Sequence, residues 1–348
     1  MADIRALEVS DLPAVRALMR AHLGGWDGDE AFLAATALEY PWADPEIPSL
    51  VATEDGRVVG WIAAAVRRLR FDDREIRGVC CSHLVVDPAS RSTAAGALLL
   101  SRLLAGPQEL TWSDSANDPV LRMWRIYGGQ IDHSRACDWM LVLRPLRWLA
   151  GIAAAMPRRR AATRELIPVA AFPFQALGAR RRADRDDASE VAGEDAGPAE
   201  VVESWPQLAV KRRIRPEYDR AFLGHLFSLI AGRDGPLTVR LVRRGTTPIG
   251  LYVFVPGRNG GVRVLHLSGR EPDLPAVMGE LVEHVRGQGA QFIVGRLEPH
   301  LDVAVRERLA AIGLARRPIV HSRDPELLAA VQADAALLTR LDSEWFWT

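Results

Sequence analysis

Residues 83–101 read HLVVDPASRSTAAGALLLS, and they change from strand-forming to turn-forming to helix-forming residues along their length. Val85 and Val86 are apolar and β-branched, as in a buried strand, and Asp87-Pro88 ends that strand because proline cannot continue a hydrogen-bonded ladder. The alanine- and leucine-rich segment 94–100 favours a helix. The stretch therefore predicts a buried strand, a short loop and a helix, in that order.

The loop of this unit combines a fixed cation, two hydroxyl groups and three small residues, namely Arg91, Ser92, Thr93, Ala94, Ala95 and Gly96. The first turn of a helix exposes unpaired backbone N–H groups and the positive end of the helix dipole. Small residues at that point let a phosphate group approach the backbone closely. The pattern therefore favours a phosphate-binding loop.

The run Arg91 to Gly96, placed after a strand that ends Val-Val-Asp-Pro, resembles the Arg/Gln-x-x-Gly/Ala-x-Gly/Ala signature of the GNAT superfamily of N-acetyltransferases. The resemblance implies that the loop binds the pyrophosphate of acetyl-CoA or another acyl-CoA, used as a co-substrate. It also implies that the preceding strand separates from its neighbour, so that its backbone pairs with the pantetheine arm. The residues implied in cofactor binding are Val85, Val86, Arg91, Ser92, Thr93, Ala94, Ala95, Gly96, Ala97 and Asn117.

A second unit resembles the same superfamily, whose motif after the fifth strand places a tyrosine seven residues after an asparagine. Here Asn117 is followed by Trp124 at that position. In many members the tyrosine protonates the departing CoA thiolate, and an indole N–H does not usefully deliver a proton. Tyr127, three residues further along the predicted helix, is the candidate substitute acid. The alternative is that Tyr127 packs and the thiol, with a pKa near the cysteine value of about 8.5, leaves unaided.

Deprotonation of the acceptor amine needs a base. His83, Ser113 and Asp114 lie where the fourth and fifth predicted strands end, so His83 and Asp114 join Tyr127 as candidate catalytic residues. For His83 the alternative is a hydrogen-bonded core histidine. No metal-ligand pattern is present, and we expect no metal cofactor.

The length, charge and apolar pattern of the chain argue against several other classes of function. The chain has 348 residues, 48% of them hydrophobic, with 44 acidic and 44 basic residues. Zero net charge gives no general electrostatic case for binding nucleic acid. No apolar stretch reaches the length of a membrane span, and the first 19 residues carry acidic groups where a signal peptide carries basic ones, so we expect a cytoplasmic protein with no stable membrane insertion. We expect the three cysteines to be small buried hydrophobic residues in a reducing compartment; they are Cys80, Cys81 and Cys137.

The order of predicted elements in the first half repeats from Trp205 onward, with Val59-Gly60-Trp61-Ile62 and Ile249-Gly250-Leu251-Tyr252 at matching hairpin positions. We expect an α/β (α+β) fold of two tandem GNAT-like domains, each a mixed, largely antiparallel sheet flanked by helices. The predicted division is an acyl-CoA-binding domain over 1–150, a linker helix and charged loop over 151–204, and a degenerate GNAT-like domain over 205–348. In the second copy, segment 269–275 carries two prolines and two acids in place of the phosphate loop, which predicts that this copy is not catalytic.

Several local expectations follow from the same patterns. We expect a turn over 71–76, a surface loop in the middle of 178–197, a helix over 301–312, and a final strand within 337–347. The segment 141–156, followed by three arginines, favours a connecting helix over a membrane-surface helix. The candidate acceptor contacts are Trp26, Asp27, Asp29, Glu30, Tyr40 and Trp42, with ordinary helix packing as the alternative for each.

The expected activity is the transfer of an acyl group from acyl-CoA to a small-molecule amine by direct attack, with acetyl-CoA as the expected donor. The alternative is a non-catalytic acyl-CoA-binding regulatory or interaction protein with the same fold. The sequence leaves open the acceptor, the acyl chain length and the choice between monomer and homodimer.

Overall fold

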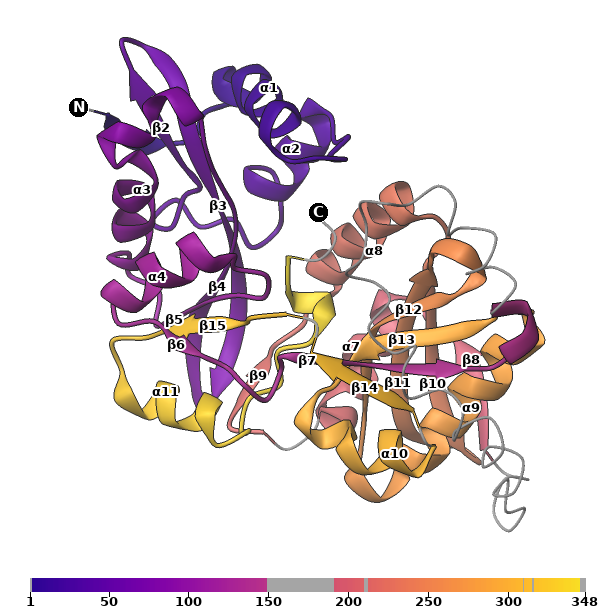
Figure 1. Ribbon diagram of the computed structural model, residues 1–348. Coiled ribbons are helices and arrows are strands. Elements are labelled where there is room, and N and C mark those ends of the chain that lie inside the picture. The colour runs from indigo at the N-terminus through magenta and orange to yellow at the C-terminus, as the bar shows by residue number, and fades with distance from the viewer. Residues whose placement is uncertain (1, 149–190, 210–211, 309, 315, 345–348) are drawn as a thin grey trace.

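The computed structural model describes residues 2–148, 191–209, 212–308, 310–314 and 316–344. These residues form two lobes that lie side by side, each a mixed β-sheet with helices on its faces (Figure 1). We call the lobe that begins at the N-terminus the first lobe and the other the second lobe. The expected α/β fold with two helix-flanked mixed sheets is confirmed.

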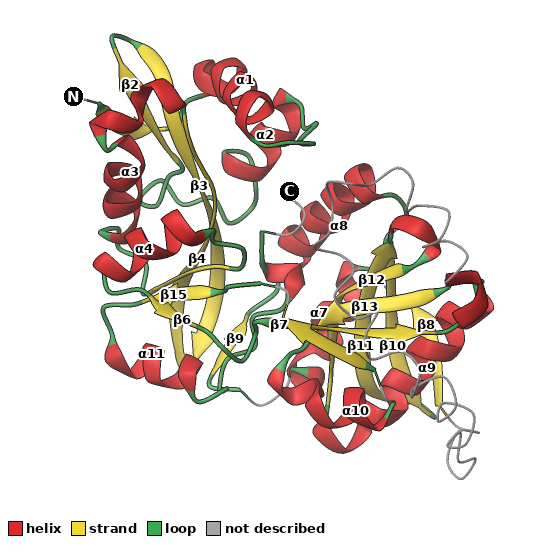
Figure 2. Ribbon diagram, in the orientation of Figure 1, coloured by secondary structure: helices red, strands yellow, loops and turns green. Residues whose placement is uncertain are grey.

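The first lobe is built on one sheet with α1 and α2 on one face and α3 and α4 on the other (Figure 2). Its strands are β1 (Asp3–Ala6), β2 (Leu50–Glu54), β3 (Arg57–Phe71), β4 (Arg74–Val86), β5 (Leu110–Ser113), β6 (Gln130–Ile131), β9 (Ile214–Pro216) and β15 (Ile319–His321). Its helices are α1 (Leu12–His22), α2 (Glu30–Ala37), α3 (Ala95–Leu104), α4 (Asp118–Ile126) and α11 (Pro325–Gln332). The strand order is β1-β2-β3-β4-β5-β15-β6, and β9 pairs with β3.

The second lobe repeats this plan. Its strands are β7 (Cys137–Val142), β8 (Val191–Asp195), β10 (Thr238–Arg244), β11 (Thr247–Pro256), β12 (Val262–Gly269), β13 (Phe292–Arg296) and β14 (Ala311–Leu314), in the order β14-β7-β13-β12-β11-β10-β8. Its helices are α7 (Pro198–Leu208), α8 (Arg220–Asp234), α9 (Leu274–Gly287) and α10 (Asp302–Glu307). In both lobes two antiparallel pairings are followed by a parallel one, β4 with β5 and β12 with β13.

Matching glycines let the crossover helices approach the two sheets closely. A Cβ atom on Gly60 would lie 3.3 Å from Leu99 of α3, and one on Gly250 would lie 2.2 Å from Val277 of α9. A side chain at Gly250 would force Val277 to move, and one at Gly60 would require its neighbours to give by a few tenths of an ångström. The two hairpin sequences that predicted the repeat therefore occupy equivalent places.

The division of the chain into sheets differs from the predicted division at residues 150 and 205. β7 precedes residue 150 but pairs with β13 and β14 in the second lobe. β15, from the end of the chain, inserts between β5 and β6 of the first lobe, and β9 pairs with β3 there. In Figure 1 the magenta β7 lies in the second lobe, and the yellow β15 and α11 lie in the first. Each half of the chain thus completes the sheet of the other.

The turn expected within 71–76 is present at residues 72–73, in the β3–β4 hairpin, with Asp72 at φ 51°. Most of the middle of 178–197, expected as a surface loop, lies outside the described residues, and residues 191–195 form β8 on the edge of β10. Two local expectations need correction. The helix expected over 301–312 ends at Glu307, because residues 311–314 pair with β7 as β14. The tail expected to be a strand instead contains the 3₁₀ helix Arg340–Asp342.

The aromatics Trp345, Phe346 and Trp347 lie outside the described residues, as does most of the expected connecting helix, 149–156.

Candidate functional site

The strands β4 and β5 separate near their carboxyl ends. They pair in parallel only from Gly78 with Leu110 to Cys80 with Trp112, and β4 then continues to Val86 alongside β3. Beyond Ser113 the chain turns away from β4 into α4. We call the opening between Cys81–Val86 and Ser113–Ser115 the first fork. Among the described residues, no strand pairs with Cys81–Val86 on the side that faces the fork, which is the separation that the family resemblance implied.

His83 lies at a bulge in β4 inside this fork. The register of β4 on β3 shifts between Trp61 and Ala63, and His83 has a φ of 51°, a left-handed conformation that is uncommon for a residue with a side chain. Its Nδ1 lies 2.9 Å from Ser82 Oγ, and its ring stacks on Trp61 at a centroid distance of 6.1 Å. The predicted catalytic histidine is therefore at the fork, held by neighbours of its own sheet.

The phosphate-loop motif opens α3, as predicted. The 3₁₀ helix Pro88–Thr93 leads into Ala94, which has a φ of 59° and caps α3 in the left-handed region. The first helical bond joins Leu98 N to Ala94 O at 3.0 Å, so by helix geometry the amides of residues 95–97 point out of the helix start. A Cβ on Gly96 would touch only Val86 Cγ2, at 3.4 Å. The side chains of residues 91–93 lie outside the described ones.

The second predicted unit forms around α4. Asn117 caps this helix by accepting a hydrogen bond from Val120 N at 3.1 Å, so its side chain has a structural role. Trp124 is 1% exposed and belongs to the core. The Tyr127 hydroxyl donates to Ala97 O at 3.3 Å, which places it at the first turn of α3. The role of Tyr127 as an acid stays a prediction. Its position beside the phosphate loop is compatible both with a proton donor and with a residue that only packs.

Asp114, the other candidate base, is engaged in a buried ion pair that joins the lobes. Its carboxylate lies 2.7 Å from Arg296 Nη1, at the end of β13, and Arg296 Nε also donates to Glu298 at 2.7 Å. Burial alone would lower the pKa of Arg296, but Asp114 and Glu298 raise it above its ordinary value. Asp114 therefore binds a permanent cation, and a carboxylate held in this way is a weaker proton acceptor.

A second carboxyl group, which no sequence pattern indicated, is bound at the end of β5 beside Asp114. Glu344, from the C-terminal segment, is 3% exposed, and one of its oxygens accepts three hydrogen bonds. The donors are Ser113 Oγ at 3.1 Å, Asp114 N at 2.8 Å and Ser115 Oγ at 2.7 Å. The Glu344 charge also contributes to raising the pKa of the Cys80 and Cys81 thiols, after the larger effect of burial. The carboxyl group therefore lies at the base of the first fork.

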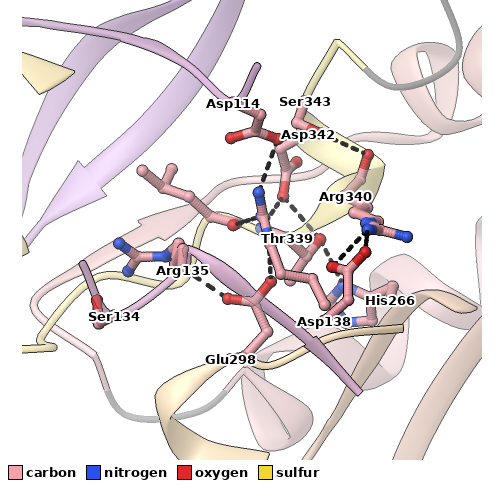
Figure 3. Close-up of polar contacts among 12 residues, drawn as sticks. Asp114, Ser134, Arg135, Asp138, His266, Glu298, Thr339, Arg340, Asp342 and Ser343 are labelled. Atoms are coloured by element: carbon pink, nitrogen blue, oxygen red, sulfur yellow. Dashed lines mark hydrogen bonds and ion pairs between the residues drawn. The ribbon is translucent and has the colours of Figure 1, made fainter. Parts of the chain in front are cut away.

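The same C-terminal segment fills the corresponding fork of the second lobe, where β12 and β13 separate after Arg263. Thr339 Oγ1 lies 3.1 Å from His266 Nδ1 on β12, while Leu338 O accepts a hydrogen bond from Arg296 at the end of β13. Arg340 continues the contact with an ion pair to Asp138 at 2.5 Å (Figure 3). A ligand cannot pair with β12 there without displacing this segment.

The helix start of the second lobe also differs from that of the first. Asp273 precedes α9, and its carboxylate pairs with Arg244 at 2.7 Å and with Arg270 at 2.8 Å. The Asp273 carboxylate lies at the start of α9, where it would repel a phosphate, and the two arginines that could attract a phosphate are already paired with it. This supports the prediction that the second copy does not bind the cofactor.

Several candidate acceptor contacts have structural partners. Trp42 stacks on Phe222 at 3.5 Å and donates to Asp219 at 2.6 Å, which joins the lobes. Tyr40 accepts from Val66 N at 2.9 Å, and Asp29 caps α2. For these three residues the packing alternative describes the observed contacts.

No three His, Cys, Asp or Glu side chains of the described residues gather as a metal-binding group. None of the helices in the described part of the chain is long and apolar enough to span a membrane.

No known family model matches the sequence, and no curated protein matches it either. Solved structures do match. A GCN5-related N-acetyltransferase from Anabaena variabilis aligns with a TM-score of 0.62 at 10% identity, covering 93% of this chain and 74% of that one. A probable N-acyltransferase from Enterococcus faecalis gives 0.61 at 8% identity over 92% and 73%. Eis1 from Mycobacterium abscessus gives 0.55 at 15% identity over 95% and 76%.

These matches cover both lobes, and their identities are low enough that they speak for architecture alone. The chain therefore has the fold of the GNAT N-acetyltransferases that its phosphate-loop motif resembles.

Proposed function

We propose that this protein is an acyl-CoA-dependent N-acyltransferase that acts on a small-molecule amine by direct attack, with acetyl-CoA as the first donor to test. The observation that carries the proposal is the first fork, where an open strand edge leads directly to a helix start built from small residues. Such a pair offers backbone donors and acceptors to an extended arm and backbone amides to a diphosphate.

The residues present fit an acyl-CoA. Val85 and Val86 would offer backbone groups to the pantetheine arm, and the amides of residues 95–97, which point out of the start of α3, would bind the pyrophosphate. Gly96 leaves the space that a diphosphate needs at the helix start. The CoA thioester supplies an activated acyl carbon. The chain's own part is to hold that carbon beside the amine and to keep water out of the fork.

The proposal is tested by a charge introduced at the helix start. Gly96→Glu places a carboxylate beside the pyrophosphate position, and we expect at least a tenfold loss of CoA affinity by calorimetry. Gly232→Glu is the matched control, because Gly232 lies exposed in α8 with open space around it. Circular dichroism of both variants should match that of the wild type. Unchanged CoA binding by Gly96→Glu would refute the loop assignment.

One observation favours a second candidate function. The position that resembles the family's proton-donating tyrosine is held by Trp124, which is buried in the core. A protein that binds acyl-CoA without turning it over, as a regulator or interaction module, is compatible with that residue. CoA release measured with acetyl-CoA and a panel of primary amines separates the two functions.

A further inference from the structure

We infer that Glu344, contributed by the C-terminal segment, is the general base that takes the proton from the acceptor amine in the first fork. The inference rests on the proposed function and adds to it the residue that starts the reaction. Glu344 lies between the end of β5 and residues 80–81 of β4, where the resemblance to GNAT enzymes places the reacting end of the cofactor.

Three consecutive residues fix this carboxyl group from one side. Ser113, Asp114 N and Ser115 all donate to the same oxygen, Oε1, at 2.7–3.1 Å. Convergence of three donors on one oxygen defines the orientation of the group, as a positioned base requires. Because all three donors bind Oε1, their hydrogen bonds leave Oε2 for contact with an ammonium group.

The other acidic groups at the fork are less available. Asp114 is held by Arg296 at 2.7 Å, and Arg296 also binds Glu298. Glu344 forms no ion pair within 4.0 Å among the described residues. A carboxylate without a fixed cation can both attract an ammonium ion and accept its proton.

The electrostatic surroundings favour such a role at neutral pH. Burial, followed by the nearby Asp114 charge, raises the pKa of Glu344 to about 7, while the hydrogen bonds from Ser115 and Ser113 and the Arg316 charge oppose that rise. The neighbouring Cys80 and Cys81 have pKa values raised well above the ordinary value by burial, so both stay neutral thiols. A base that titrates near the working pH transfers protons most efficiently.

The proposed step balances without any other reactant. Glu344 takes one proton from the ammonium group of the acceptor, which frees the nitrogen lone pair. That pair forms the C–N bond to the thioester carbonyl carbon, while the C–S bond breaks and its electrons leave on sulfur. The nitrogen gives its second surplus proton to the thiolate. The products are the amide and CoA thiol, and the proton on Glu344 returns to solvent.

The test compares acceptors that need a base with one that does not. Glu344→Gln keeps the size of the side chain and loses its basicity, and turnover is measured with acetyl-CoA and a panel of primary alkylamines. We expect kcat to fall about 100-fold with alkylamines. With hydroxylamine, which is uncharged at pH 8, we expect less than a threefold change. Acetyl-CoA affinity should stay within threefold of the wild type.

Asp342→Asn is the matched control, because Asp342 lies two residues earlier in the same buried segment and binds Tyr218 and Thr339 outside the first fork. It should leave the ratio of alkylamine to hydroxylamine turnover unchanged. In a further variant, Ser115→Ala, loss of a hydrogen bond to Glu344 should move the acidic limb of the kcat/KM profile to higher pH.

The outcomes separate the two proposals. A wild type that binds acetyl-CoA but releases CoA with none of the amines overturns the proposed function and this inference with it. A wild type that turns over alkylamines, with Glu344→Gln equally active or equally impaired with both kinds of acceptor, overturns the role of Glu344 alone.

Discussion

At the scale of single residues, Glu344 makes the stability of the folded protein depend on pH. Its pKa is about 7 in the folded chain, chiefly because of burial, against about 4.3 for an unfolded glutamate. The folded state therefore binds the proton more tightly. The stability contributed by this group is complete below about pH 4 and is lost as the pH rises through 7.

Glu344→Gln isolates this effect because the amide does not titrate. We expect the free energy of unfolding of the wild type, relative to that of the variant, to fall by roughly 2–3 kcal/mol between pH 4.5 and pH 8. Urea unfolding of both proteins at four pH values in this range measures the difference. A difference that stays constant with pH would mean that Glu344 titrates in the folded protein as it does in water.

No local pattern in the sequence pointed to Glu344. Its three hydrogen-bond donors lie 229–231 residues earlier in the chain, and its own neighbours in the sequence are aromatic residues that suggested a buried terminal strand. By contrast, His83 and Asp114 were placed at the fork because strand ends can be read from composition. Position along a strand is a local property, whereas burial of a distant carboxylate depends on the complete fold.

At the scale of elements, α3 begins at an alanine whose backbone has a left-handed conformation that glycine adopts more easily. Ala94 has a φ of 59° and a ψ of 22°, and a left-handed conformation costs an L-residue about 1–2 kcal/mol. Ala94→Gly removes that cost but increases the entropy of the unfolded chain. We expect a net gain of about 0.5–1 kcal/mol in the free energy of unfolding, seen as a higher urea midpoint with an unchanged slope.

The matched control for this prediction is Ala97→Gly, inside the same helix. That change should lower the free energy of unfolding by about 0.5–1 kcal/mol, because glycine is unfavourable in a helix interior. A lower midpoint for both variants would show that the conformation of Ala94 carries no strain.

Elements with strong local signals were predicted well, and short strands with distant partners were not. α1 begins and ends at the predicted residues, because Pro13 sits in its first turn and Leu12, Val15, Leu18 and Met19 form one buried face. β14 and β15 have four and three residues, and each exists only through pairing with a strand from the first half of the chain. Nothing in their own sequence specifies that partner.

At the scale of the whole molecule, strand exchange and buried charge join the lobes. β7 and β15 each complete the sheet of the opposite lobe. Arg296 of the second lobe pairs with Asp114 of the first, and a buried cation without its partner is costly, by about 3–5 kcal/mol. One hydrophobic cluster also runs from the first lobe into α7 and α8 of the second. Opening either lobe therefore exposes buried groups of the other.

We therefore expect the lobes to unfold together, although proteins with two sheets of this size often unfold in steps. The backbone amides of Val320 in β15 and Met140 in β7 report on the first and second sheets respectively. Hydrogen exchange at low urea should give these two amides the same opening free energy, equal within about 1 kcal/mol to that of global unfolding. Two distinct opening free energies, or separate transitions by fluorescence and circular dichroism, would contradict this expectation. Either result would show that the exchanged strands detach before the sheets unfold. The predicted domain over 1–150 would then unfold as an independent unit.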